Sequence, residues 1–442
     1  MQMIQPRTLK GFRDFLPEAM IPREKLVATA QQVYRSFGYS PIDTPILEYL
    51  EILQGKGGDE SDRLMYHFED HGGRAVGMRF DLTVPLARFA AQHAAELGMP
   101  FKRYHIAKVW RGENTHRGRY REFMQCDFDT IGTESIAADI ETVLVVHELM
   151  QAIGLSEFQI RFNNRKVLSG LLAKLGLADQ STAVLRALDK LAKIGPDKVA
   201  MEMVAVAGAS ESQAKEVLAL AEINGTNDEI LLQLAKLVEG SEEGEAGVAA
   251  LRDVTTGALA AGVSADRLSI DVSIARGLDY YTGTVIETFL KQLPEIGSVC
   301  SGGRYDDLAS VYTKQRLPGI GASLGLDRLL AAMEELGLIE RVNTPAPIFI
   351  PFFDATRLHD YLALATQLRS AGLGVEVYAE AKKLGQQLKY ADRRGFRLAI
   401  IAGDRELDSQ TCQVKDLKDG STIELSTSDP NWVDQIKLQL KK

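Results

Sequence analysis

A long helical block set between stretches with strand patterns constrains the fold of this chain most. From about Arg165 to Asp266 the chain is rich in Ala, Leu, Glu and Lys, has few aromatic residues and repeats apolar residues at helical spacing. Strand patterns lie on both sides of it: Ile106 to Arg111, Phe123 to Ile131, Leu268 to Val272, Thr284 to Phe289 and Gly319 to Leu324. We therefore expect one sheet that is interrupted by a separate helical insertion.

Further elements are expected in the first part of the chain and around the last of these strands. Apolar spacing predicts amphipathic helices at Arg23 to Phe37, Ala138 to Ile153 and Asp327 to Leu336. The prolines in Ser40 to Leu50 favour an irregular or edge strand. Leu64 to Phe68, a Gly-Gly turn and Ala75 to Phe80 predict a β-hairpin.

A proline-containing linker, Thr344 to Pro347, separates a second pattern from the first. Behind it, strand and helix patterns alternate as β-α-β-α-β: Ile348 to Phe352, Leu358 to Ser370, Val375 to Tyr378, a basic helix to Arg394, and Leu398 to Ala402. This order predicts a compact C-terminal α/β domain.

Length and composition limit the classes of protein that fit. The chain has 442 residues, which suggests about three domains at roughly 150 residues each. The 51 Lys and Arg residues and 60 Asp and Glu residues leave a net charge of −9, which argues against a purely electrostatic binder of polyanions. The three cysteines form no metal-binding or redox pair, and no apolar run is long enough for a signal peptide or a membrane span. We expect a cytoplasmic protein with no membrane partner.

Several polar motifs are candidates for chemistry, although each alone has an ordinary structural explanation. Arg111 precedes a basic loop, and Arg328 follows a strand with glycines at Gly319, Gly321 and Gly325; either arginine alone is more simply a surface ion pair. His67 and His71 could be metal ligands, but a polar hairpin tip is the better explanation, because no third His or Cys ligand is near in the sequence. The segment from Arg276 to Gly283 holds a cation, a carboxylate and two phenols, which favours a binding site over a simple turn.

Together these segments resemble the class II aminoacyl-tRNA synthetases, and within them the histidyl-tRNA synthetase family. The surroundings of Pro45 resemble motif 1, Val109 to Gln125 resembles motif 2, and Gly319 to Arg328 resembles motif 3. Arg276 to Gly283 and Ser301 to Asp306 resemble the two segments specific to the histidine enzyme. The resemblance covers essentially the whole chain.

The resemblance implies an α+β fold and a set of boundaries. It implies a mixed, mostly antiparallel class II catalytic sheet with helices, a helical insertion domain and a C-terminal α/β anticodon-binding domain. The expected segments are 1–164 for the first part of the catalytic domain, 165–266 for the insertion, 267–341 for its second part, 342–347 for the linker and 348–442 for the anticodon-binding domain.

The resemblance also implies the reaction and its residues. A homodimeric enzyme would join L-histidine to ATP, release pyrophosphate and transfer the histidyl group to the 3′ end of tRNA(His). Arg111 and Arg276 would be catalytic, on opposite sides of the α-phosphate, with Mg²⁺ bridging the other phosphates. The implied ATP-binding residues are Arg111, Glu113, Arg119, Phe123 and Arg328. The implied histidine-binding residues are Asp81, Thr83, Arg111, Gln125, Asp129, Arg276, Tyr280 and Tyr281, and no residue is assigned as a metal ligand.

Within the histidine set, Asp129 and Tyr281 would recognise the imidazole, and Asp81, Thr83 and Gln125 the α-ammonium group. Contact with tRNA is favoured over a merely solvated helix face for the C-terminal basic residues, because it agrees with the rest of the resemblance: Lys382, Lys383, Lys389, Arg393 and Arg394. The alternative function is a catalytically silent paralogue that acts as a regulatory subunit in histidine biosynthesis. An apparently complete C-terminal domain and the intact set of site residues count against it.

Overall fold

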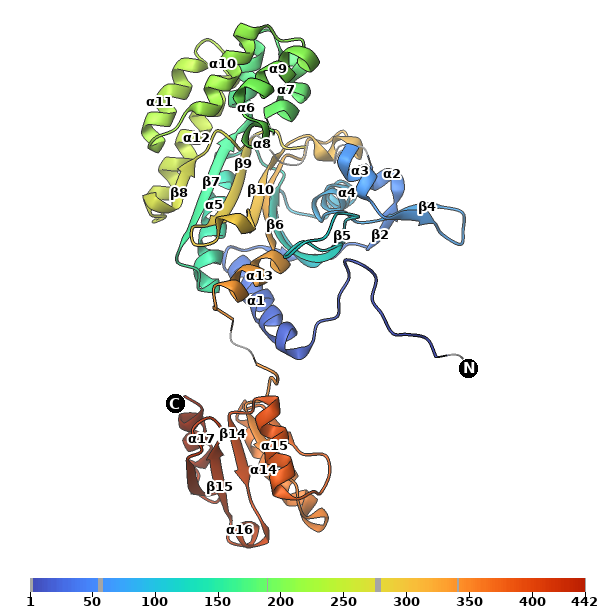
Figure 1. Cartoon of the computed structure of the whole chain (residues 1–442), viewed down its shortest axis with the longest axis vertical. Helices are drawn as coiled ribbons and strands as arrows, with labels where there is room; N and C mark the ends of the chain where they lie inside the picture. The colour runs from blue at the N-terminus through green and yellow to red at the C-terminus, as the bar shows by residue number, and fades with distance from the viewer. Residues whose placement is uncertain (1–2, 55–58, 189, 275–279, 340–341, 442) are drawn as a thin grey trace. The chain divides into compact units, whose positions relative to one another are not determined.

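The computed structural model of the chain describes residues 3–54, 59–188, 190–274, 280–339 and 342–441. Its contacts divide the chain into two compact units (Figure 1). The first consists of Met1–Arg13 and Leu26–Leu338, and the second of Asp14–Lys25 and Ile339–Lys442.

An eight-stranded sheet lies at the centre of the first unit, in the order β1-β5-β6-β11-β10-β9-β7-β8. Its strands are β1 (Ser40–Pro41), β5 (Phe101–Trp110), β6 (Glu122–Ile131), β7 (Phe158–Asn164), β8 (Leu268–Ile270), β9 (Thr284–Leu290), β10 (Cys300–Tyr305) and β11 (Gly319–Gly325). The central strands from β5 to β7 pair antiparallel, and the outermost strands β1 and β8 pair parallel. The predicted mixed, mostly antiparallel sheet is confirmed.

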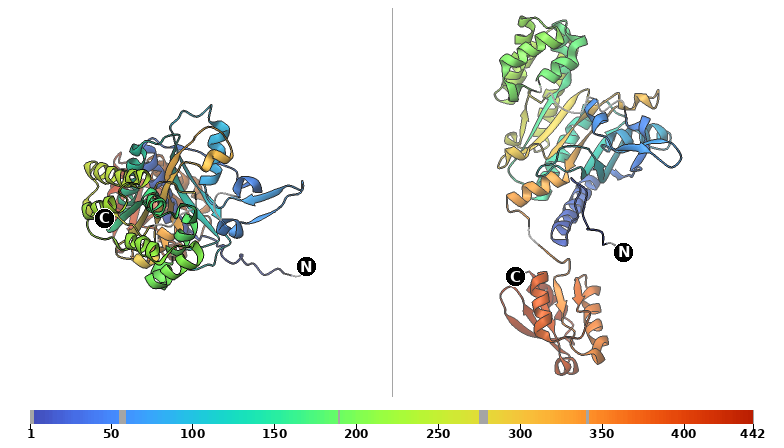
Figure 2. Two further views of the ribbon diagram at one scale, coloured as in Figure 1. Left: turned by 90° about the horizontal axis from the view of Figure 1, so that it is seen from above. Right: turned by 45° about the vertical axis from the view of Figure 1, so that its right-hand side comes forward.

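The sheet is interrupted by helices, as expected. β7 precedes the helical block and β8 and β9 follow it, yet Ile160 of β7 lies opposite both Leu268 and Thr288. The intervening helices gather at one end of the sheet in the right-hand view of Figure 2. They are α6 (Arg165–Lys174), α7 (Ser181–Leu188), α8 (Leu191–Ile194), α9 (Pro196–Ala207), α10 (Glu211–Glu222), α11 (Asn227–Leu237) and α12 (Glu242–Ala260). Capping boxes at Ser210 and Thr226 begin α10 and α11.

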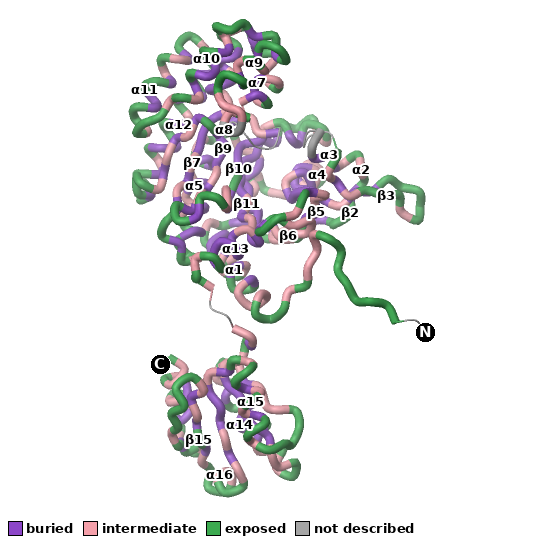
Figure 3. Tube along the Cα trace, viewed as in Figure 1, coloured by how far each residue is buried: buried purple, intermediate pink, exposed green. Residues whose placement is uncertain are grey.

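Other helices pack directly on the sheet. α5 (Ile136–Ile153) contacts β7 and β11, and α13 (Leu326–Glu335) contacts β6 and β11. The side chain of Ser135 accepts a hydrogen bond from the first turn of α5, and Gly154 ends that helix in the left-handed region. The central strands carry many of the buried residues (Figure 3).

A small three-stranded sheet in the same unit has the order β2-β4-β3, with β2 (Leu47–Tyr49), β3 (His67–Glu69) and β4 (Ala75–Met78). β3 and β4 form the predicted hairpin, and both pairs of strands are antiparallel. Short helices α2 (Leu50–Leu53), α3 (Asp59–Leu64) and the longer α4 (Thr83–His93) surround it in the sequence.

The second unit contains a five-stranded sheet, β13-β12-β14-β15-β16. β12 (Ile348–Ile350), β13 (Val375–Val377) and β14 (Leu398–Ile401) are parallel, and β15 (Thr411–Asp416) and β16 (Thr422–Ser426) continue the sheet antiparallel. Its helices are α14 (Leu358–Ser370), α15 (Leu384–Arg394), α16 (Asp404–Asp408) and α17 (Trp432–Leu440). The β-α-β-α-β order is confirmed, and the two further strands and helices were not predicted.

Some boundaries and elements differ from expectation. The first helix, α1 (Pro17–Ser36), begins earlier than Arg23, because proline is well suited to a first helical position. β7 and β10 were not predicted as strands. In β10 the glycines hide the pattern, yet a Cβ on Gly302 would lie 2.1 Å from the carbonyl oxygen of Gly321, so only glycine fits between these strands. Among the described helices none is long and apolar enough to cross a membrane.

Candidate active site

A cavity of about 500 Å³ lies against the central strands of the large sheet. Its walls come from β6, β9, β10 and β11, the loop after β5, the start of α4 and the start of α13. The lining includes these residues predicted from the sequence: Asp81, Thr83, Arg111, Glu113, Arg119, Phe123, Gln125, Asp129, Tyr280, Tyr281 and Arg328. Arg276 is the remaining predicted residue, and it lies outside the described residues.

The side chains on one face of β6 point into the cavity. Phe123, Gln125 and Asp129 line it, and so does Asp127 between them. Phe128 instead packs on Tyr34 of α1, with 5.1 Å between the ring centroids. Because successive strand residues point to opposite faces, every second residue of β6 serves the site.

One end of the cavity is lined by buried carboxylates. Asp129 accepts a hydrogen bond of 2.6 Å from the hydroxyl of Tyr305, and its other oxygen lies 2.7 Å from Nη2 of the fully buried Arg103. Burial raises the pKa of Asp129, although Arg103 opposes the shift. Gly321 lies opposite Asp129 in β11, where a Cβ would come within 2.3 Å of the carboxylate.

Asp81 supplies a second carboxylate at this end. It accepts hydrogen bonds from the backbone N–H groups of Thr83 (3.1 Å) and Val84 (2.9 Å), so it is held at the start of α4. Burial again raises the pKa of this carboxyl group. A hydrogen bond joins the hydroxyl groups of Thr83 and Tyr280, and the Tyr280 ring packs edge-on against Tyr281 at 5.1 Å.

The other end of the cavity is cationic. The guanidinium of Arg111 lies 4.4 Å from the ring centroid of Phe80 and 5.1 Å from that of Phe123. Arg119 forms an ion pair with the buried Glu113, and Nη1 of Arg111 lies 3.9 Å from the same carboxylate. Burial and the charge of Arg119 lower the pKa of Arg328, which donates a 2.6 Å hydrogen bond to the carbonyl of Ser298. The three arginines around Glu113 leave an excess of positive charge there.

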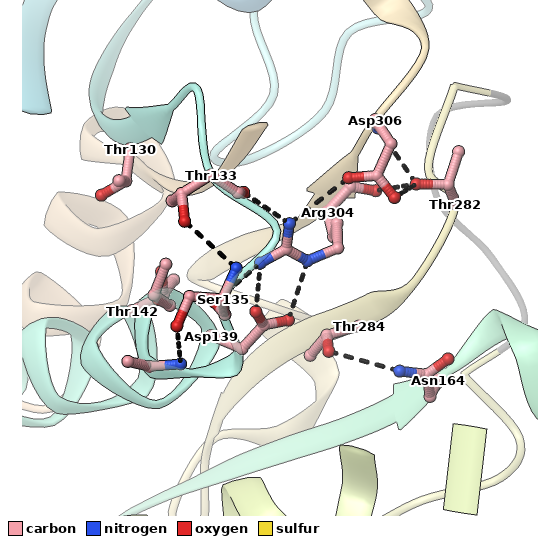
Figure 4. A network of polar contacts seen from close by, with 12 residues as sticks. Thr130, Thr133, Ser135, Asp139, Thr142, Asn164, Thr282, Thr284, Arg304 and Asp306 are labelled. Atoms are coloured by element: carbon pink, nitrogen blue, oxygen red, sulfur yellow. Dashed lines mark hydrogen bonds and ion pairs between the residues drawn. The ribbon is translucent and has the colours of Figure 1, made fainter. Parts of the chain in front are cut away.

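A network of polar contacts centred on Arg304 fixes the segment after the two pocket tyrosines (Figure 4). Arg304 of β10 pairs with Asp139 of α5 and with Asp306. The backbone N–H of Thr282 donates to the carbonyl of Arg304 (2.8 Å), and its hydroxyl donates to Asp306 (2.8 Å). Tyr281 therefore enters the cavity from an anchored segment.

Sequence reasoning gave no role to four residues of the site: Arg103, Asp127, Tyr305 and Ser323. The sequence could have indicated Asp127, because it alternates with Gln125 and Asp129 along one strand and therefore lies on the same face. Arg103 had none, since its role depends on β5 lying beside β6, where it is opposite Asp129. Tyr305 and Ser323 lie within the motif segments Ser301 to Asp306 and Gly319 to Arg328, but their contacts with Asp129 and Gln125 join strands distant in sequence.

Within the described ranges, no three His, Cys, Asp or Glu side chains cluster in a way that could hold a metal ion. His71 lies in the turn of the β3–β4 hairpin, as the sequence favoured, whereas His67 pairs opposite Gly77 at the end of β3 away from the turn.

Comparison with known proteins relates this geometry to a family. The family model described as histidyl-tRNA synthetase matches residues 11–329, and the model described as anticodon binding domain matches residues 348–430. The chain belongs to the histidyl-tRNA synthetase family. In this synthetase the cavity therefore lies in the part that the first model matches.

Relatives of the synthetase match it along almost its whole length. A histidine–tRNA ligase of Rhodopirellula baltica is 64% identical over 431 residues, covering 97% of this chain and 98% of the relative. One of Wolinella succinogenes is 44% identical over 422 residues, covering 95% of each. The crystal structure of histidyl-tRNA synthetase from a Nostoc species has a TM-score of 0.89 at 36% identity, covering 99% of this chain and 100% of that one.

Proposed function

We propose that this synthetase is a histidine–tRNA ligase. It activates L-histidine with ATP to form histidyl-adenylate and pyrophosphate, and it transfers the histidyl group to the 3′ end of tRNA(His). The observation that carries the proposal is one cavity with a cationic end around Glu113 and a carboxylate end at Asp81 and Asp129. A polyanionic nucleotide suits the first end, and an amino acid with an ammonium group and an imidazole suits the second.

At the cationic end, Arg111 binds the α-phosphate and the substrate carboxylate. Its place between two aromatic rings orients the guanidinium before the reaction, which favours stabilisation of the charged transition state. Glu113 accepts from the adenine amino group, Phe123 and Arg328 enclose the ring, and Arg119 and Arg328 bind the outer phosphates. Since Arg119 pairs with Glu113, we expect ATP binding to exchange this partner for a phosphate.

Arg276 is proposed to act on the opposite side of the α-phosphate, on the strength of the family resemblance alone. Mg²⁺ is proposed to bind with ATP and neutralise charge on its phosphates. Mg²⁺ commonly takes one or two protein carboxylates, with substrate phosphates and water as its other ligands. The lining of the cavity can supply such a carboxylate, because it includes Glu287.

At the carboxylate end, Asp129 and Tyr281 recognise the two imidazole nitrogens, with Tyr280 in the wall. Asp81, Thr83 and Gln125 bind the α-ammonium group. A site that satisfies both nitrogens rejects amino acids without them by about 10⁴-fold or more, because its buried polar groups would be left unpaired.

The second unit is proposed to bind the anticodon region of tRNA(His). Lys382, Lys383, Lys389 and Arg393 are exposed at and along α15, and they offer local positive charge on a chain of net charge −9. We keep the domain boundaries expected from the sequence as part of this proposal: 1–164 and 267–341 for the catalytic domain, 165–266 for the insertion, 342–347 for the linker and 348–442 for the anticodon-binding domain.

A homodimer is proposed to form through the small sheet. Leu47, Tyr49 and Phe68 are large apolar residues that the sheet leaves about half exposed. Tyr49 and Phe68 flank Val76 in register, so the three share one face. Contiguous exposed apolar side chains are typical of an interface, and the proposed reaction places the dimer in the cytoplasm, where translation occurs.

The regulatory-subunit alternative is not favoured. A structure titled as an ATP phosphoribosyltransferase regulatory subunit/histidyl-tRNA synthetase from Bacillus halodurans has a TM-score of 0.75, but at 22% identity this likeness concerns the fold alone.

The test of the proposed function is amino-acid-dependent exchange of pyrophosphate into ATP, run separately with each standard amino acid. Exchange with histidine alone is expected, and no exchange with any amino acid would overturn the proposed function.

A further inference from the structure

Asp127 is a third buried carboxylate at the end of the cavity that Asp81 and Asp129 line. Its residue is only 2% exposed, and its Oδ1 atom is buried without a hydrogen-bond partner. Oε1 of Gln125, two residues earlier on β6, is also buried without a partner. A buried acceptor without a donor is costly, so two of them beside one cavity indicate a ligand that supplies donors.

A chain of hydrogen bonds explains how these two acceptors are oriented. The hydroxyl of Ser323 on β11 hydrogen-bonds to the Asp127 carboxylate, and Nε2 of Gln125 donates to the Ser323 hydroxyl at 3.0 Å. A serine hydroxyl has one proton, so it donates to Asp127 and accepts from Gln125. The Gln125 amide is thereby turned with its oxygen away from Ser323.

The carboxylates at this end also favour a cation. Asp81, Asp127 and Asp129 are all buried, and Arg103 forms its ion pair with Asp129. Uncompensated charge in a buried site is strongly unfavourable. A positively charged group of the substrate beside Asp127 would compensate the charge of this carboxylate.

We propose that Asp127 binds the α-ammonium group of the amino acid through Oδ1, beside Oε1 of Gln125. The proposal rests on the proposed function and adds a residue to it. Asp127 also acts through Ser323 to hold the Gln125 amide in its accepting orientation. An ammonium group offers three donors, enough for both unpaired oxygens.

The protonation of Asp127 gives the proposal a second signature. Burial raises the pKa of Asp127 to about 7, with Asp129 and Asp81 adding to the shift and Arg103 opposing it. Binding of a cation favours the ionised form, so histidine should bind more weakly as pH falls below about 7. The titratable or charged groups facing Asp127 are Arg103 and His105 of β5, Asp129 of β6, Cys300 of β10, and Arg79, Asp81, Tyr34 and Tyr281.

The test compares the full-length chain with Asp127→Asn, which keeps the shape of the side chain. Kinetics of pyrophosphate exchange should show a KM for histidine raised about ten- to a hundredfold and an unchanged KM for ATP. Imidazolepropionate, which lacks the amino group, should inhibit both proteins equally. The variant should also lose the part of the pH profile that titrates near 7.

Two further variants make the outcome decisive. Thr130→Val changes a buried residue on the opposite face of β6 and should leave the KM for histidine unchanged. Ser323→Ala should raise that KM even if Asp127→Asn does not fold. An unchanged KM for histidine in the folded Asp127 variant, or an equal loss for histidine and imidazolepropionate, would overturn the role of Asp127. Failure of the unmodified chain to use histidine would instead overturn the proposed function.

Discussion

Single residues in the cavity are arranged for binding at the expense of stability. Oδ1 of Asp127 and Oε1 of Gln125 are buried without hydrogen-bond partners. Such groups weaken a fold unless something compensates them, and in a binding site the ligand does so. The site is therefore expected to become more stable when its polar groups are neutralised.

Asp127→Asn should accordingly stabilise the fold at neutral and alkaline pH. The folded pKa of about 7 lies above the usual value of about 3.9, so the folded state holds the proton more tightly. The contribution of the Asp127 carboxyl group to the free energy of unfolding is fully present below about pH 4 and is lost as pH rises to about 7. Urea unfolding should show the variant to be more stable at about pH 8, with the gain disappearing near pH 4. A gain that is the same at both values would contradict the assignment.

At the residue scale, the site could be predicted from the sequence wherever a motif marks it. Arg111, Glu113 and Gln125 lie in one continuous segment, so their proximity follows from local structure. Arg103 could not be found in this way, because it lies outside the motif segments and its role depends on Asp129 across the sheet. Strand pairing over long sequence separation is not encoded in any local pattern.

At the scale of elements, the anchored segment after Tyr281 links the sheet to the carboxylate end of the cavity. Arg304 ties β10 to Asp139 of α5, and Thr282 ties the segment to β10. Buried ion pairs of this kind contribute most when every partner is satisfied. The contacts with Asp306 should therefore help to hold the segment in position.

Thr282→Val tests this link with a change of nearly constant volume. Losing the hydroxyl removes its hydrogen bond to Asp306, at a cost of about 1 kcal/mol, and should raise the KM for histidine several-fold with little effect on that for ATP. Thr288→Val is the matched control, because the Thr288 hydroxyl is buried without a partner. The control should keep its KM values. Equal changes in both KM values for Thr282→Val would argue against a positioning role.

Helices and strands could be predicted from the sequence where the pattern of apolar and polar residues is strong. β6 was expected at Phe123 to Ile131 and is found at Glu122–Ile131, because alternation and β-branched or aromatic residues mark it. β10 was missed because its glycines lack the side chains that carry such a pattern, although close packing against β11 requires them. Tertiary packing there overrides local preference.

At the scale of the whole molecule, the two compact units divide the proposed work. The described residues assigned to adenylate formation all belong to the first unit, and the basic residues of α15 belong to the second. Family models match the two parts separately and leave residues 330–347 between them. The two activities should therefore be separable.

A chain truncated after Arg341 should form histidyl-adenylate but charge tRNA poorly. Its tRNA affinity should also depend less steeply on salt, because phosphate contacts release counterions and the basic residues of α15 are removed. Adenylation and charging are to be measured on both proteins across a salt series. Full charging by the truncated chain would remove the C-terminal unit from the proposed mechanism, and loss of adenylation would show that the linker is not a boundary.

The interrupted sheet also sets the order in which the protein can mature during synthesis. Gln125 of β6 and Ser323 of β11 touch across the sheet, yet they are 198 residues apart in the chain. At about 5–20 residues per second, the ribosome needs roughly 10–40 s to make the intervening chain. Until then β6 lacks its β11 partner and presents an open strand edge. The nascent chain thus passes through an interval in which shielding by a chaperone would be most valuable.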